Sequence, residues 1–388
     1  MSLITETNEL AAFCARREHD AVIAVDTEFI REKTYWPQLC LVQIAGAEEA
    51  CCIDTLAPAI DLAPLQELMA NRRVLKIFHS ARQDIEIFIA MTGVVPVPLF
   101  DTQVAAMVCG FGDSVGYETL VNTVTGVRLD KSMRFTDWSQ RPLTDRQIQY
   151  ALADVTYLLS VYESLKGRLE TEKRLSWVEE EMVTLTDPAT YRVDPHEIWR
   201  RFKPRSSNPR FLAVLRELAA WRENEAQSRN LPRQRILRDE ALLEVAALAP
   251  ATPDDLCHAR LVPKSAAEGR HGQEMLTAVA RGAAIPLARC PVLPERKLLP
   301  GGMTAVVDLL RVLLKMKCDQ HDVAQKLVAS TEDLEKMTLT DESDVPALQG
   351  WRREIFGADA LRIKQGEVAL VFSPKERRVK LMPVKRKG

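Results

Sequence analysis

The chain has 388 residues, a formal net charge of −2 and 46% hydrophobic residues, so it has the composition of a globular protein of two or three domains. No apolar run approaches the ~20 residues of a membrane span, and the acidic N-terminus lacks the basic start of a signal peptide. We therefore expect a cytoplasmic protein without membrane contacts, and the near-neutral charge excludes a histone-like nucleic-acid binder.

The first part of the chain mixes strand and helix patterns. Apolar runs predict strands over 21–29, 39–45, 51–54 and 74–78, and helices over about 81–93, 101–108 and 117–125. Thr144 and Gln147 form a capping-box pattern, which opens one long predicted helix over 145–169. Strands interleaved with helices in this way predict an α/β layer fold.

Helix patterns dominate after about residue 171. The polar segment 203–210 predicts a linker, and a helical unit follows it to about residue 282. Four prolines interrupt 285–300, and a third unit is predicted to be helical from 301 to about 356. The tail 375–387 is strongly basic, and we expect it to be mobile.

A pair of acids marks the end of the first strand. Asp26 and Glu28 are two residues apart, so both project from the same face of that strand. Two carboxylates at the end of an apolar strand are costly unless something pairs with them, and a divalent cation with oxygen ligands suits them. The alternative is that the strand has ended and the acids are solvated.

Two later motifs supply further acids. Asp84 lies in the first turns of a helix, where the helix dipole alone also favours an acid. Tyr150 and Asp154 are four residues apart on one helical face, where helix–sheet packing of the tyrosine is the alternative. Four converging acids would repel one another unless two Mg²⁺ or Mn²⁺ ions neutralised them, as in two-metal phosphodiester hydrolysis.

The order of these motifs resembles that of the DEDD exonucleases, Tyr subclass, and neighbouring stretches are similar to those of the bacterial ribonuclease D family. The matching segments are 26–28, 79–84, 129–132, 137–138, 141–144 and 150–159. The resemblance implies a ribonuclease-H-like α/β domain with a mixed sheet flanked by helices. It also implies two divalent ions and 3′→5′ hydrolysis of RNA that releases nucleoside 5′-monophosphates.

The helical part of the chain carries a second resemblance. Segments 215–223, 229–232 and 236–243 are similar to the all-α HRDC domain, which helps hold nucleic acid in this family, and the third unit is similar by position to a diverged copy. We therefore predict an exonuclease domain with a trailing helical linker over 1–205, an HRDC domain over 206–288, and a second HRDC-like domain with a basic tail over 296–388.

The resemblance assigns roles to the motif residues. One ion would be held by three acids and activate water, while Asp26 would bridge to a second ion and Asp84 would assist through coordinated water. Tyr150 would position the attacking water, because a phenol with a pKa of ~10 is neutral at pH 7. The predicted catalytic residues are therefore Tyr150 and the four metal ligands Asp26, Glu28, Asp84 and Asp154.

Three further residues are predicted to contact the substrate: Thr27, Phe29 and His79. For Phe29 the alternative is a core position, and for His79 it is a structural role at the entry to a helix. The expected substrate is RNA with a free single-stranded 3′ end, tRNA precursors included, and the expected state is a monomer. A DNA exonuclease of the same fold and a non-catalytic RNA-binding scaffold are the competing hypotheses.

Overall fold

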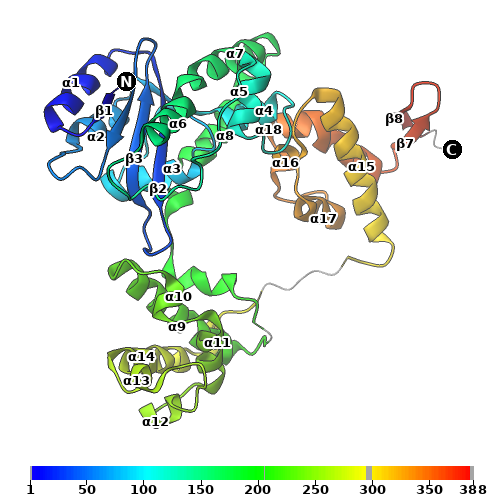
Figure 1. Ribbon diagram of the computed structural model, residues 1–388. Helices are drawn as coiled ribbons and strands as arrows, with labels where there is room; N and C mark the ends of the chain where they lie inside the picture. Colours follow the sequence, from blue (N-terminus) through cyan, green and yellow to red (C-terminus); the bar gives the residue numbers. More distant parts are fainter. Residues whose placement is uncertain (1, 205, 294–298, 385–388) are drawn as a thin grey trace.

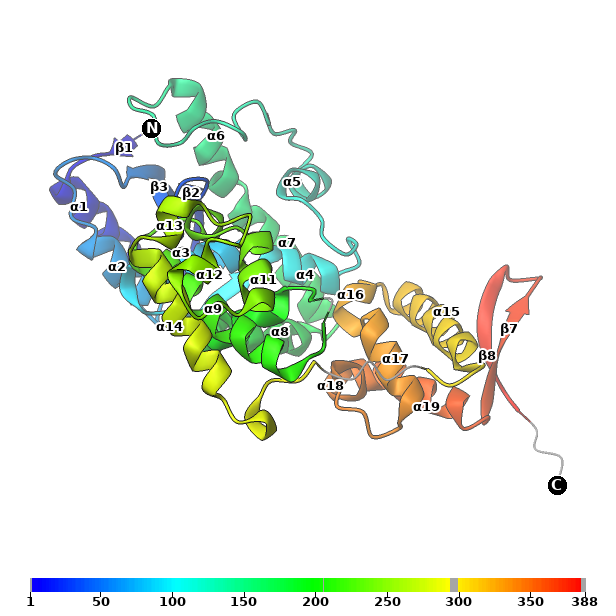
Figure 2. The same ribbon diagram turned by 90° about the horizontal axis from the view of Figure 1, so that it is seen from below.

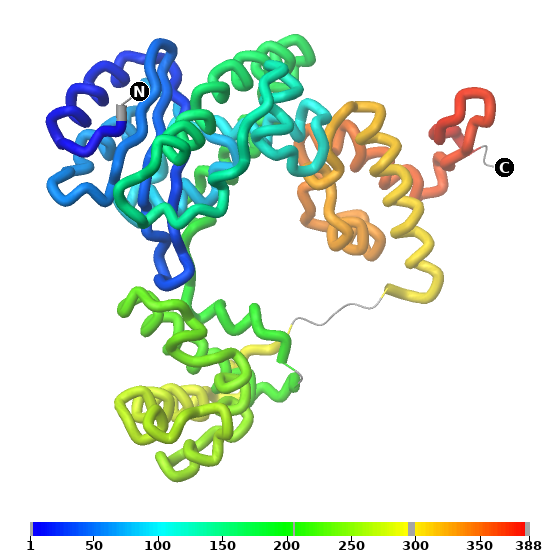
Figure 3. The backbone as a smooth tube through the Cα atoms, viewed as in Figure 1, coloured from blue at the N-terminus to red at the C-terminus, as the bar shows by residue number. Residues whose placement is uncertain are grey.

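The structure, a computed structural model, describes residues 2–204, 206–293 and 299–384. Separate hydrophobic cores form in an N-terminal unit (residues 2–191), a second unit (193–293) and a third unit (299–384) (Figure 1). Within these described ranges, no helix is both long enough and apolar enough to cross a bilayer. Figure 3 shows the backbone passing through the three units in sequence order.

The N-terminal unit is built on a six-stranded mixed sheet with the order β1-β4-β3-β2-β5-β6. β2 (Val22–Ile30) lies inside the sheet, antiparallel to β3 (Gln38–Ala45) and parallel to β5 (Leu75–Phe78). These strands and β4 (Ala50–Asp54) confirm the four predicted strands. β1 (Ser2–Ile4) and β6 (Leu99–Asp101) were not predicted, because three residues are too few to show a periodicity.

Helices cover the sheet, and their starts follow local signals. Asp101 accepts backbone hydrogen bonds from Gln103 and Val104, and Thr144 forms the predicted capping box with Gln147. The helices of this unit are α1 (Thr7–Arg17), α2 (Ala63–Ala70), α3 (Arg82–Thr92), α4 (Thr102–Val108), α5 (Tyr117–Thr125), α6 (Asp145–Thr156), α7 (Leu158–Thr171) and α8 (Leu175–Thr186).

The single long helix predicted over 145–169 is wrong, because the chain breaks it at Tyr157 into α6 and α7. Two β-branched residues, Val155 and Thr156, precede the break, and the Thr156 hydroxyl donates to the Leu152 carbonyl at 2.7 Å. Both features weaken or bend a helix. The break allows α6 to pack on β3 and β4, while α7 packs beneath α4 and α5.

The second unit is helical, as predicted. α9 (Pro209–Ser228) is its buried centre and begins with Asn208 as cap, so the predicted linker ends there. α14 packs closely on α9: a Cβ atom on Gly282 would lie 2.6 Å from Val214 Cα. The remaining helices are α10 (Arg233–Ile236), α11 (Asp239–Leu248), α12 (Pro253–Leu256), α13 (Lys264–Ala267), α14 (Arg270–Ala284) and the 3-10 helices Pro195–Arg201 and Leu287–Arg289. A further 3-10 helix, Pro188–Tyr191, packs on the N-terminal core.

The third unit is helical to Lys364 and ends in a β-hairpin. Its helices are α15 (Met303–His321), α16 (Gln325–Val328), α17 (Thr331–Leu339), the 3-10 helix Pro346–Leu348, α18 (Gly350–Arg352), the π-helix Arg353–Gly357 and α19 (Ala358–Lys364). Helix therefore continues past the predicted end near residue 356.

The basic tail, which was expected to be mobile, instead contributes a strand over 378–383. β8 (Arg378–Pro383) pairs antiparallel with β7 (Val368–Ser373). The apolar side chains of Leu370, Val379 and Leu381 lie on one face and pack on the third core. The prediction rested on the charge of the tail and did not take account of this alternation of apolar residues. Residues 385–387 of the tail lie outside the described part of the chain.

Both helical units contact the N-terminal unit. On the third unit, Trp351 stacks on Trp177 of α8 with ring centroids 4.3 Å apart, and Arg352 forms an ion pair with Glu181. Figure 2 shows α16 and α18 of the third unit facing the N-terminal unit. The second unit is joined through the β2–β3 turn, as described below. The boundaries of the three predicted domains stay predictions.

Candidate active site

β2 places the first two acids at its C-terminal end. Asp26 and Glu28 lie on one face of the strand, and the register with β3 shifts between Glu28 and Phe29. Such β-bulges re-aim side chains and are common beside active sites. Phe29 is half-buried beyond the bulge, and its contact with substrate stays a prediction.

Three of the predicted acids come together. Carboxylate oxygens of Asp26, Glu28 and Asp154 lie within 4.8 Å of one another, although the first two lie on β2 and the third on α6. All three side chains are partly buried, so they face a shared space rather than bulk solvent. Their oxygen-only donor set suits a hard divalent cation such as Mg²⁺ or Mn²⁺.

The fourth acid, Asp84, is held by a hydrogen bond from Thr27. Asp84 lies in the first turn of α3, is 6% exposed, and accepts a hydrogen bond from the Thr27 hydroxyl. Its charge raises the pKa of both Asp26 and Glu28, so it lies near them, although it is outside the group of three. The Thr27 hydroxyl is already used in this hydrogen bond to Asp84. A contact of Thr27 with substrate stays a prediction.

Burial raises the pKa of every acid in the site, and the charges of the other acids raise it further at Asp26 and Glu28. Burial is the largest cause, raising the pKa of Glu28 to about 9 and those of Asp84 and Asp154 to about 7. The pKa of Asp26 lies well above its usual range, through burial and then the charges of the other three acids. Four carboxylates with raised pKa values are typical of a site in which bound divalent ions balance the negative charge.

Tyr150 stands beside Asp154 on α6. Burial, followed by the charges of Asp154 and Glu28, raises the pKa of its phenol, so the hydroxyl stays protonated and can donate. Its hydrogen bond to Asp154 lowers the pKa of that acid, against the effect of burial. The Tyr150 ring lies 6.1 Å from that of Trp138, which limits where it can turn.

Asp26 and Asp154 line a pocket of about 350 Å³ whose opposite wall carries both acidic and basic side chains. Lys131 and Arg134 line it from the loop before α6, and the charge of Arg134 lowers the pKa of Asp154 and Tyr150. Neither cation was among the predicted site residues. Two basic residues within a four-residue run ahead of the Tyr150 motif were the available signal.

His79 and Ser80 line the same pocket. The His79 ring nitrogens lie 2.9 Å from Thr102 Oγ1 and 3.1 Å from the Val115 carbonyl oxygen, which favours a bracing role, and its contact with substrate stays a prediction. Ser80 has a φ of 67°, a left-handed conformation held by Asp101, which accepts from the Ser80 N–H at 3.0 Å. No local sequence signal reveals such a serine.

Comparisons with known proteins agree with this site. Residues 1–170 match a 3′-5′ exonuclease family, and residues 211–279 match the HRDC domain. The chain is 53% identical to ribonuclease D of Granulibacter bethesdensis, covering 97% of this chain and 95% of that protein. It is 50% identical to ribonuclease D of Jannaschia sp., covering 98% and 99%.

A solved structure extends the similarity to the whole fold. RNase D of Escherichia coli, described as an exoribonuclease involved in structured RNA processing, superimposes with a TM-score of 0.80 at 30% identity, covering 94% of this chain and 98% of that one.

Fold, acidic site and family matches define a 3′→5′ exonuclease that carries an HRDC domain. The chain belongs to the ribonuclease D family and is a hydrolytic 3′→5′ exoribonuclease, in a fold whose activity depends on divalent metal ions. The predicted family and fold class are therefore confirmed.

Proposed function

We propose that this chain removes nucleotides one at a time from single-stranded 3′ ends of RNA by two-metal-ion hydrolysis. The observation that carries the proposal is the convergence of the Asp26, Glu28 and Asp154 carboxylates within 4.8 Å. When bound, two divalent ions activate a water molecule and stabilise the charge that develops on the phosphate and on the leaving 3′-oxygen. The products would be nucleoside 5′-monophosphates.

The acids divide into two ligand sets. Asp26, Glu28 and Asp154 would share one ion, because their oxygens are close together. Asp84 lies outside that group and is held by Thr27, so it would serve the second ion together with Asp26. Burial and the resulting raised pKa values support this assignment, since ligands that repel one another gain most from a bound cation.

Tyr150 would orient the attacking water. Its raised pKa keeps the phenol protonated, so it acts as a donor that fixes the geometry of the water rather than as a phenolate base. Arg134, across the pocket, would hold the phosphate next to the scissile bond through charge-assisted hydrogen bonds, and Lys131 would join it on leaving its ion pair with Glu118. Together these side chains would place the last phosphodiester beside the acids.

Precursors of tRNA with extra 3′ residues are the substrates we infer. A pocket of about 350 Å³ suits the end of one strand, within the ~300–1,000 Å³ of ligand sites. The Escherichia coli relative, described as processing structured RNA, supports substrates with a folded body and a free 3′ tail. We also infer a cytoplasmic monomer, and the eight free cysteines support a reducing compartment.

The test compares nucleic acids that differ in one respect. A tRNA-like RNA with an unpaired 3′ extension, the same RNA with a paired 3′ end and a DNA copy of the extended molecule are incubated with Mg²⁺ or Mn²⁺. We expect shortening by single nucleotides only for the unpaired RNA extension. Faster cleavage of the DNA copy, or binding of RNA without any cleavage, would contradict the proposal.

A further inference from the structure

A second basic cleft lies where the β2–β3 turn, residues 31–37, meets the second unit. It has a volume of about 610 Å³, within the ~300–1,000 Å³ range of ligand sites. One carboxylate, Asp239, lines it, against five cationic side chains: Arg31, Arg201, Lys203, Arg222 and Arg233.

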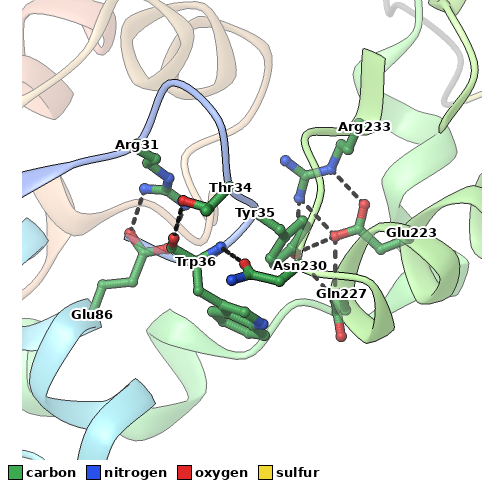
Figure 4. Close-up of polar contacts among 9 residues, drawn as sticks. All are labelled: Arg31, Thr34, Tyr35, Trp36, Glu86, Glu223, Gln227, Asn230 and Arg233. Carbon is green, nitrogen blue, oxygen red and sulfur yellow. Dashed lines mark hydrogen bonds and ion pairs between the residues drawn. The ribbon is translucent and has the colours of Figure 1, made fainter. Parts of the chain in front are cut away.

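A buried polar junction holds the two walls of this cleft together (Figure 4). The Tyr35 hydroxyl donates to the carboxylate of Glu223, a side chain on α9 that is 0% exposed. Arg233 donates to Glu223 and, at 3.0 Å, to the Tyr35 oxygen. The backbone N–H of Trp36 donates to Asn230 Oδ1 at 3.0 Å. The cleft is thus a fixed feature between the turn and α9–α10.

The cations of the cleft are not all neutralised. Arg31 pairs with Glu86 at 2.8 Å, Arg222 with Asp239 at 2.6 Å, and Arg233 with Glu223 at 2.5 Å. Arg201 and Lys203 are exposed, and among residues 2–204, 206–293 and 299–384 no carboxylate forms an ion pair with either. Two positive charges in the cleft are therefore available to an anionic ligand.

The cleft adjoins the active site along one strand. β2 carries Asp26 and Glu28 and ends at Ile30, so Arg31 follows directly at the mouth of the cleft. Arg31 pairs with Glu86 on α3, two residues beyond Asp84. In Figure 1 the second unit lies just beyond the β2–β3 turn. A strand whose 3′ end occupies the acidic site can reach this cleft with its upstream phosphates.

We propose that this cleft binds backbone phosphates of the RNA strand upstream of the 3′ end, with Arg201 and Lys203 as the main contacts. The inference rests on the proposed function, because it assumes an RNA end among the acids. Phosphate contacts of this kind carry no sequence information and track the backbone of a single strand. They keep the substrate bound while its end is shortened.

The test uses the charge reversal Arg201→Glu with Lys203→Glu and a matched control, Arg260→Glu with Lys264→Glu. The control pair lies in the same unit, between the end of α12 and the first residue of α13, and neither residue lines the cleft. Substrates are a dinucleotide and an RNA with a single-stranded 3′ tail of about 15 nucleotides, which spans one continuous groove. Thermal unfolding checks that both variants fold; if the reversal does not, Arg201→Gln with Lys203→Gln replaces it.

We expect the cleft variant to raise the KM for the tailed RNA about tenfold. The slope of log binding constant against log salt concentration should become shallower by about 1.4, because two phosphate contacts are lost and each contributes ~0.7. The dinucleotide, too short to reach the cleft, should be cleaved as by wild type, and the control should match wild type on both substrates. An unchanged salt slope, or an equal loss on both substrates, would overturn the inference. Failure of the proposed function is distinct, since wild-type protein would then cleave neither substrate.

Discussion

Thr27 donates a hydrogen bond from its hydroxyl to the carboxylate of Asp84 and thereby joins the strand and the helix that carry the site. Thr27 lies between Asp26 and Glu28 but points to the opposite face of β2, where it is 6% exposed. Both faces of one short strand segment therefore serve the site: one presents Asp26 and Glu28, and the other holds Asp84 in place.

Replacing Thr27 by Val tests this support, because valine keeps the shape and removes the donor. The hydrogen bond lowers the pKa of Asp84, so its loss should raise that pKa further and weaken metal-dependent hydrolysis. A buried acceptor without its donor should also cost about 1–3 kcal/mol of folding free energy. The measurements are chemical unfolding and the Mg²⁺ concentration for half-maximal rate. Thr27→Ser, which keeps the hydroxyl, should lie close to wild type; equal behaviour of Thr27→Val and wild type would refute the support.

Asp154→Asn separates catalysis from folding. Removing one negative charge should reduce nucleotide release at least about 10²-fold, because the shared ion loses a ligand. The same change should raise the melting temperature in chelator, since Asp154 adds to the repulsion that raises the pKa of Glu28. Paired measurements of rate and melting temperature check both effects. A variant that is inactive and also less stable would show a structural role instead.

The stability of the metal-free protein should fall as the pH rises. The folded-state pKa values of Glu28, about 9, and of Asp84 and Asp154, about 7, exceed the reference values of ~4 for these acids. The folded state therefore binds more protons than the unfolded state, and stability is lost between about pH 4 and pH 9. Melting temperatures in chelator should decline across this window, and Mg²⁺ should restore more at pH 8 than at pH 6. A rise in chelator across this window would contradict the pKa shifts.

Tyr150→Phe isolates the role of one hydroxyl. We expect kcat to fall by about 10²-fold, because the attacking water loses its positioning donor. The lost hydrogen bond should also raise the pKa of Asp154 further, so the variant should need more Mg²⁺ for half-maximal rate at neutral pH. Because burial and the acids raise the pKa of this phenol, wild-type activity should show no loss attributable to its ionisation below pH 10. Single-turnover rates measure the effect, and an unchanged rate would remove Tyr150 from the mechanism.

The sequence was most informative where a signal is local. The apolar run that forms β2, the cap at Asp101 and the capping box at Thr144 each depend on neighbouring residues, and each prediction is confirmed. The combined motifs, together with the family resemblance, nominated four acids, and the structure brings Asp26, Glu28 and Asp154 of these within 4.8 Å of one another.

What the sequence did not reveal depends on contacts between distant segments. Ser80 takes its left-handed conformation because Asp101 holds its N–H, and no property of Ser80 itself predicts this. The cleft exists because Tyr35 meets Glu223, 188 residues away. The formal charge of −2 was likewise misleading, because an average over the chain hides the basic lining of the cleft.

The most direct test of the central claim follows one labelled RNA under metal control. An RNA with an unpaired 3′ tail, labelled at its 3′-terminal nucleotide, is incubated with wild-type protein in Mg²⁺, in excess chelator, and after Mg²⁺ is restored. We predict release of labelled nucleoside 5′-monophosphate in Mg²⁺, none in chelator, and full recovery on restoration. Undiminished release in excess chelator would contradict the claim that the acids of β2, α3 and α6 act by holding divalent ions.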